Sequence, residues 1–166
     1  MTRAVINNWK KTALHFAAGD GHVEVAKVLL ENGAKVNAVD KFKRTALRMV
    51  AQHGHIDVPK VLLEYGADVN AVDYLKRAAV HDAAALGHVE IAKVVIQNGA
   101  NVNAANEEMD TDGTITERTA LVYALEHELV DVAKLLIQNG ADVNAVEKLT
   151  IKHISRSPQI ESCRYP

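Results

Sequence analysis

The chain has 166 residues, a formal net charge of −2, and a composition that is 48% hydrophobic but only 4% aromatic. No stretch approaches the roughly 18 consecutive apolar residues of a membrane-spanning helix, and residues 1–6 lack the apolar run of a signal peptide. The lone Cys163 excludes an intrachain disulfide framework. We therefore expect one intracellular, cytoplasmic domain in a reducing compartment; the sequence leaves open export as an effector by a specialised bacterial secretion system.

A unit of about 33 residues recurs along the chain. Each copy carries a four-residue box at the start of its first helix, which reads TALH from Thr12, TALR from Thr45, AAVH from Ala78 and TALV from Thr119. Each continues with a longer stretch, which reads HVEVAKVLLENGAKVNAVD, HIDVPKVLLEYGADVNAVD, HVEIAKVVIQNGANVNAAN and LVDVAKLLIQNGADVNAVE in turn. Apolar residues at helical spacing, followed by a glycine suited to a helix C-cap, predict two helices per copy. The order within a copy is hairpin, helix, Gly-His turn, helix and loop.

These features resemble the ankyrin repeat, whose T-P-L-H-x-A signature and period of 33 the copies nearly reproduce over about residues 7–147. The resemblance implies an all-α, ankyrin-repeat solenoid of stacked helix-turn-helix units with projecting β-hairpin loops. It also implies a non-catalytic protein-protein interaction module. The copies depart from the family pattern where alanine replaces the proline of the box, and where the fourth copy loses its Gly-His turn to Glu128 and Leu129. The hairpin glycine is also replaced, by Lys10, Lys43, Lys76 and Glu117.

The repeats set the domain boundaries. We expect a repeat domain over residues 1–154, with repeats at about 7–39, 40–72, 73–105 and 114–146 and a partial or capping unit at 147–154. Leu149, Ile151 and Ile154 could cover the last helix pair, and residues 155–166 are expected to form a disordered tail. The first repeat lacks the polar capping character that a free solenoid end requires. Either its exposed face is tolerated, or the chain is a structural fragment of a longer ankyrin array.

An insertion separates the third repeat from the fourth, because the spacing of their glycines is 41 residues rather than 33. The eight extra residues lie in 106–117 and are predicted to form a loop. Glu108, Asp110 and Asp112 match the first ligand positions of an EF-hand calcium loop. Thr119 stands where a bidentate glutamate should close that site, so an ordinary acidic turn is the favoured interpretation and weak calcium binding the alternative.

Eight histidines raise the question of a metal or catalytic site. Five of them stand at repeat-defining places, namely His15, His22, His55, His81 and His88. Equivalent residues recur one repeat apart, roughly 10 Å at normal helix spacing, which is too far for shared ligation at the ~2 Å bonds of zinc. No nucleophile elbow, P-loop or HExxH motif is present. We therefore expect no enzyme activity, no metal and no cofactor.

The hairpin tips carry residue types that the scaffold does not need. In proteins with such repeats, these tips and the end of the first helix form the concave binding face, and Trp, Tyr and Arg are enriched at interface hot spots. The predicted partner-binding residues are Trp9, Lys11, Phe42, Arg44, Gln52, His53, Tyr74, Leu75, Arg77, Leu86, Ile115 and Arg118. In this hypothesis Arg44, Arg77 and Arg118 pair with acidic groups of the partner. The apolar anchors are Trp9, Phe42, Tyr74 and Leu75.

The cations of the hairpins form a predicted basic ridge, made of Lys10, Lys11, Lys43, Arg44, Lys76, Arg77 and Arg118. Such a ridge would steer an acidic partner. We therefore expect a monomer that binds an unidentified protein and no membrane. Plain solubility is one alternative, and association with nucleic acid is another, disfavoured because no groove-reading helix is evident. The recurring Val-Asn-Ala asparagines are expected to bond loop backbone; they are Asn37, Asn70, Asn103 and Asn144.

Overall fold

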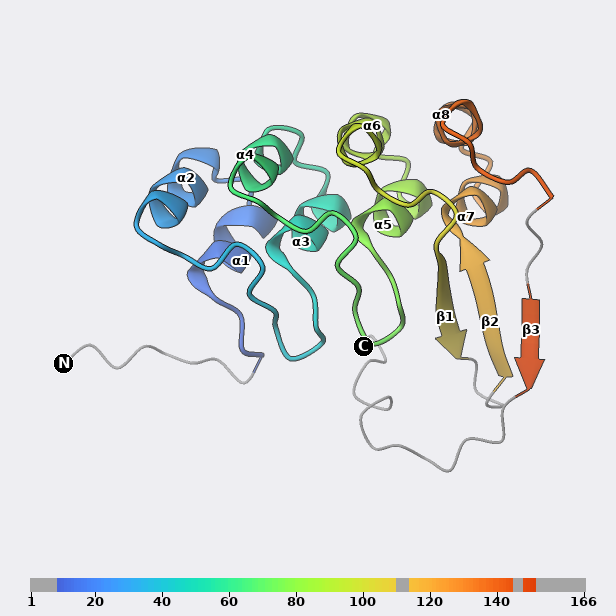
Figure 1. Ribbon diagram of the computed structural model, residues 1–166, viewed down its shortest axis with the longest axis horizontal. Coiled ribbons are helices and arrows are strands. Elements are labelled where there is room, and N and C mark those ends of the chain that lie inside the picture. The colour runs from blue at the N-terminus through green and yellow to red at the C-terminus, as the bar shows by residue number, and fades with distance from the viewer. Residues whose placement is uncertain (1–8, 110–113, 145–147, 152–166) are drawn as a thin grey trace.

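A computed structural model of the chain describes residues 9–109, 114–144 and 148–151. In these residues short helices stack in pairs into an elongated array, and the hairpins project from one side of it (Figure 1). The helices are α1 (Ala13–Gly19), α2 (Val23–Glu31), α3 (Ala46–His53), α4 (Val58–Glu64), α5 (Ala79–Ala85), α6 (Val89–Gln97), α7 (Ala120–Glu126) and α8 (Val130–Gln138). The strands are β1 (Ala105–Met109), β2 (Thr114–Thr119) and β3 (Lys148–Ile151). The predicted helical solenoid is confirmed, with a small sheet at its C-terminal end.

Each helix pair follows from the box and the turn behind it. The box residue before the first helix is extended, and the Thr45 hydroxyl accepts a hydrogen bond from the Arg48 amide over 3.4 Å. The turn between the helices needs a positive φ, which Gly54 supplies at 85° and which Glu128 adopts at 55° where the glycine is lost. Helices of seven to nine residues are not stable alone. Packing between repeats therefore supplies their stability.

The helices form two layers. The first helices of the repeats (α1, α3, α5 and α7) make one layer and the second helices (α2, α4, α6 and α8) the other, each packing on its counterpart in the next repeat (Figure 1). Ala18, Ala51 and Ala84 are fully buried where the first helices meet. Small side chains let the helices approach closely, which explains a hydrophobic chain with few aromatics. Within the described residues, no helix is long and apolar enough to cross a membrane.

A ladder of asparagines joins successive repeats. The Asn37 amide donates to the Gly66 carbonyl over 3.1 Å, and its oxygen accepts from the Asp68 amide over 2.8 Å. Asn70 and Asn103 make the same two bonds to the repeat that follows each of them. The predicted bonds to loop backbone are thus confirmed for three asparagines, and they run from one repeat to the next.

The insertion is a hairpin of strands, not the loop predicted from the sequence. β1 pairs antiparallel with β2 from Ala105 opposite Thr119 to Met109 opposite Ile115. β2 is the middle strand, because β3 pairs with its other edge from Thr114 opposite Ile151 onward. Eight extra residues lengthen the two limbs enough for a hydrogen-bonded ladder, and the Thr-Ile-Thr run of β2 favours strand. Residues 110–113 lie outside the described part.

The predicted capping unit is described only over residues 148–151. Its backbone forms β3 and runs along β2 at the edge of the sheet. Ile154 and the expected tail 155–166 lie outside the described residues. That Leu149 and Ile151 cover the last helix pair stays a prediction.

Candidate functional site

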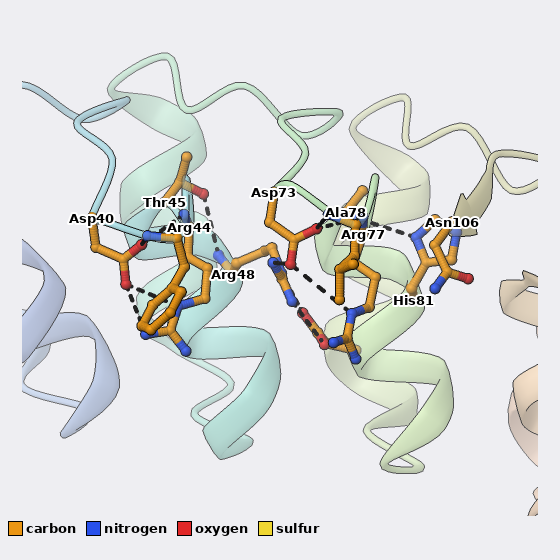
Figure 2. Close-up of polar contacts among 12 residues, drawn as sticks. Asp40, Arg44, Thr45, Arg48, Asp73, Arg77, Ala78, His81 and Asn106 are labelled. Carbon is orange, nitrogen blue, oxygen red and sulfur yellow. Dashed lines mark hydrogen bonds and ion pairs between the residues drawn. The ribbon is translucent and has the colours of Figure 1, made fainter. Parts of the chain in front are cut away.

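A buried aspartate shapes the hairpin tips of the second and third repeats. The Asp40 carboxylate accepts hydrogen bonds from the Phe42 amide over 2.8 Å and from the Arg44 amide over 2.9 Å. Asp73 makes the same two backbone bonds one repeat later (Figure 2). A side-chain oxygen that accepts from the backbone two and four residues on closes the chain into a tight turn. The residues of the tip are thereby held in fixed positions.

The tip residue in each of the first three hairpins is a lysine in the left-handed region. Lys10, Lys43 and Lys76 have φ values of 53°, 61° and 55°. These are positions where the family pattern has glycine, and a side chain there costs roughly 1–2 kcal/mol. Glu117, which the sequence aligns with these lysines, lies in β2 and has no such φ.

The hairpin arginines face carboxylates of their own chain. Arg44 contacts Asp40 over 2.7 and 2.9 Å, and Arg77 lies 4.0 Å from Asp73. Arg118 lies 3.1 Å from Glu108 and 3.6 Å from Glu126. The fourth ion-paired cation of the predicted ridge is Lys76, whose pKa is raised by its hydrogen bond with Glu107 and by the charge of that carboxylate. The sequence hypothesis assigned acidic groups of a partner to these three arginines, whereas in the structure they lie beside carboxylates of the chain itself.

A strip of aromatic rings and lysines crosses the first three hairpins. It consists of Trp9, Lys41, Phe42, Lys43 and Tyr74, and we call it the hairpin strip. The Trp9 and Phe42 rings lie 5.5 Å apart, and the Lys41 ammonium lies 3.4 Å from the centre of the Trp9 ring and 4.8 Å from that of Phe42. The Lys43 ammonium lies 4.9 Å from the centre of the Tyr74 ring. Each of these three lysine–ring distances is within the range of a cation–π interaction.

The strip keeps apolar surface and the charge of Lys43 exposed, whereas Lys41 and Phe42 are half-buried. Trp9 is 46% exposed and Tyr74 is 38% exposed, although large aromatics are normally buried. Among the described residues, neither Lys41 nor Lys43 lies within 4.0 Å of a carboxylate. Lys41 was missing from the predicted contacts, although it precedes Phe42 and occupies the hairpin position that Tyr74 holds one repeat later.

The other predicted contact residues are more dispersed. Lys11 lies over the Phe16 ring at 5.7 Å, away from the strip, and Leu75 and Gln52 are half-buried. The His53 ring bonds the Met49 carbonyl over 2.7 Å. Leu86 is exposed at the end of α5.

The fourth hairpin is built around contacts within the chain. Ile115, a predicted partner-binding residue, is buried in the middle strand and so is not available for contact at the surface. The Asn106 amide donates to the Tyr123 hydroxyl over 3.0 Å, and burial and the charge of Glu108 raise the pKa of Tyr123. Glu108 lies in β1 and binds Arg118, so the calcium hypothesis gains no support from it. Asp110 and Asp112 lie outside the described residues, and the described ones contain no cluster suited to a metal.

A buried ion triad joins the second and third repeats, and sequence reasoning missed it. Arg48 takes the place of the box histidine and contacts Asp82 over 2.5 Å (Figure 2). Its Nη1 also lies 2.5 Å from Asp73, as an ion pair without the angle of a hydrogen bond. Burial opposes the charge of Arg48, but Asp82 and Asp73 outweigh it and raise the pKa of the guanidinium. The signal was an arginine in the box with an aspartate 34 residues later.

Three of the box and turn histidines, His15, His55 and His81, bond the scaffold, as predicted. His15 accepts from the Thr12 amide over 3.1 Å and contacts the Arg44 carbonyl of the next repeat over 2.9 Å. His81 likewise accepts from the Ala78 amide over 3.1 Å, but its carbonyl partner is Ala104, at the end of the same repeat, over 2.8 Å. His55 contacts the Gly19 carbonyl over 2.8 Å. Burial lowers the pKa of both box histidines, partly offset by their carbonyl partners.

These features define the class of protein: a repeat scaffold whose stacked helices present the variable hairpin tips in one row. The sequence model of the family described as ankyrin repeats (3 copies) matches residues 2–73, 32–106 and 75–147. The chain therefore belongs to the ankyrin repeat family. Ankyrin repeats are generally protein-protein interaction modules and are typically non-catalytic. No match was found among curated proteins.

Proposed function

We propose that this protein binds an acidic segment of a partner protein through the hairpin strip. The observation that carries the proposal is the exposure of Trp9 and Tyr74 beside two lysines that have no carboxylate partner in the described residues. Aromatic side chains supply apolar contact area at low entropic cost, and the lysines supply positive charge at the rim. A partner segment that mixes apolar and acidic residues fits both features.

Arg44 supports the strip. Arg44 holds the Asp40 turn and also lies 4.7 Å from the centre of the Phe42 ring. It therefore fixes the ring beside Trp9 instead of reaching toward a partner. Lys43 and Lys41 take over the charge-pairing role that the sequence hypothesis gave to the arginines.

The nucleic-acid alternative is weakened by the same contacts. Four of the seven ridge cations, Arg44, Lys76, Arg77 and Arg118, lie within 4.0 Å of carboxylates. Phosphate binding needs cations that release counterions, and cations already neutralised do so poorly.

Selection from a displayed library of random peptides tests the proposal. Acidic peptides with apolar residues should be enriched, and their binding should weaken with salt. The double variant Trp9→Ala/Tyr74→Ala should lose binding while its circular dichroism is unchanged. Tyr65→Ala is the matched control, because Tyr65 is 41% exposed but lies beyond the end of α4. Undiminished binding by the folded double variant would refute the role of the strip.

A further inference from the structure

Both ends of the array carry apolar faces of the kind that is buried between repeats. Val25 in α2 is 51% exposed, whereas its equivalents Val58, Ile91 and Val132 are at most 1% exposed. Phe16 in α1 is 46% exposed, whereas Met49 and Tyr123 at the same position of other repeats are buried. These side chains are exposed only in the first repeat. The face that they share therefore normally receives a preceding repeat.

The opposite end shows the complementary pattern. Leu125 in α7 is 59% exposed, whereas the equivalent Ala18, Ala51 and Ala84 are fully buried. Val143 is 63% exposed, whereas its equivalents Val69 and Val102 are buried. This face normally receives a following repeat. We call Phe16 and Val25 the N-terminal face, and Leu125 and Val143 the C-terminal face.

The polar groups of the asparagine ladder make the two end faces complementary as well. Asn144 is the fourth rung, and it is exposed at the C-terminal face. The groups that would receive it are the Gly33 carbonyl and the Lys35 amide, which are the first-repeat equivalents of the Gly66 carbonyl and Asp68 amide bonded by Asn37. In the described part of the chain, neither these two groups nor the Asn144 side chain makes a ladder bond. One end thus lacks the partner that the other end offers.

We propose that the C-terminal face of one copy docks on the N-terminal face of a second copy, so that the array continues from chain to chain. The contact repeats the junction seen three times within the chain: apolar faces meet, and Asn144 bonds Gly33 and Lys35 of the second copy. Unlike a two-fold contact, this head-to-tail contact leaves a free face at each end and allows further growth. The surface is separate from the hairpin strip. This proposal differs from the monomer expected from the sequence.

Paired variants test this head-to-tail contact in the full chain. By light scattering after gel filtration, the mass of the wild type should rise between about 1 and 500 µM. Val25→Glu and Leu125→Glu should each weaken self-association at least tenfold, because a buried carboxylate would lack a partner. Mixed together, the two variants should form a 1:1 dimer that grows no further, since each retains one intact face. Asn144→Ala should weaken association severalfold, which apolar stickiness alone would not predict.

Ile56→Glu is the matched control, because Ile56 is 53% exposed but lies in a central repeat. It should associate like the wild type. A wild type that stays monomeric throughout would overturn the proposal. So would a Leu125→Glu variant that still pairs with itself, a mixture that forms no dimer, an unaffected Asn144→Ala, or a control weakened as much as the face variants.

Discussion

Two substitutions would convert the junction between the second and third repeats into a copy of the first junction. Made together they should leave the free energy of unfolding nearly unchanged, whereas each one alone should lower it. At the first junction His15 and Met49 occupy the places of Arg48 and Asp82. The test is therefore the pair Arg48→His and Asp82→Met, made singly and together. In the double variant Arg77 is also free to close on the Asp73 carboxylate, as Arg44 closes on Asp40.

The magnitude follows from burial. The side chain of Arg48 is 1% exposed and those of Asp73 and Asp82 are 8% and 7% exposed, so none is well solvated. Removing one member of a buried ion pair costs about 3–5 kcal/mol, whereas replacing the whole pair by well-packed apolar groups is often neutral. We expect about 3 kcal/mol for each single change and at most about 1 kcal/mol for the double change.

Urea unfolding followed by circular dichroism measures the free energies of the four proteins in this cycle. A cost of about 3 kcal/mol corresponds to a loss of about 6–12 °C in Tm for a chain of this size. The coupling energy between the two positions should be about 5 kcal/mol in magnitude, because the two single costs of about 3 kcal/mol together exceed the double cost of about 1 kcal/mol by that amount. Two single changes that simply add, with coupling below about 0.5 kcal/mol, would refute the buried triad.

Three further predictions concern the scaffold. The pKa of His15 and of His81 is lowered from its usual 6.5, so the unfolded chain binds protons at a higher pH than the folded chain. The free energy of unfolding should therefore be largest above that pH and fall as the pH drops below it. In His81→Gln the urea midpoint should depend less on pH. Lys43→Gly should raise stability by about 0.5–1 kcal/mol in urea unfolding, because φ is 61°. Gly54→Ala should cost about 2 kcal/mol or more, since φ is +85° and its methyl group would lie 2.7 Å from the His88 ring; an unchanged midpoint in either variant would contradict these backbone arguments.

The helices were predictable because the same helical pattern occurs in four copies of the repeat. Apolar spacing, box and glycine agree in every copy, so the local signals reinforce one another. The insertion was mistaken for a loop because strand pairing depends on partners distant in sequence, and part of its support comes from β3, where the period has faded. Contacts that joined equivalent positions, such as the asparagine ladder, could be foreseen from the repeat alone.

The site was harder to predict, because exposure and charge pairing are set by neighbouring repeats. The residue type alone did not show that Arg44, Arg77 and Arg118 face carboxylates of the chain. Nor did it show that Ile115 is covered in the middle strand of a sheet. The exposure of Trp9 and Tyr74 could be predicted because large aromatics at solvent-facing turns have no role in packing the solenoid.

The left-handed lysines connect the stability of the hairpins to the proposed binding strip. A chain selected only to fold would place glycine at Lys10, Lys43 and Lys76, because each lysine costs roughly 1–2 kcal/mol of backbone strain there. Local rules broken without structural gain are expected at functional positions. Lys43 lies over Tyr74, so its strained backbone places a cation beside an exposed ring. If the strip binds an acidic segment, Lys43→Gly should make the protein more stable and its binding weaker, whereas a lysine kept only for solubility would leave binding unchanged.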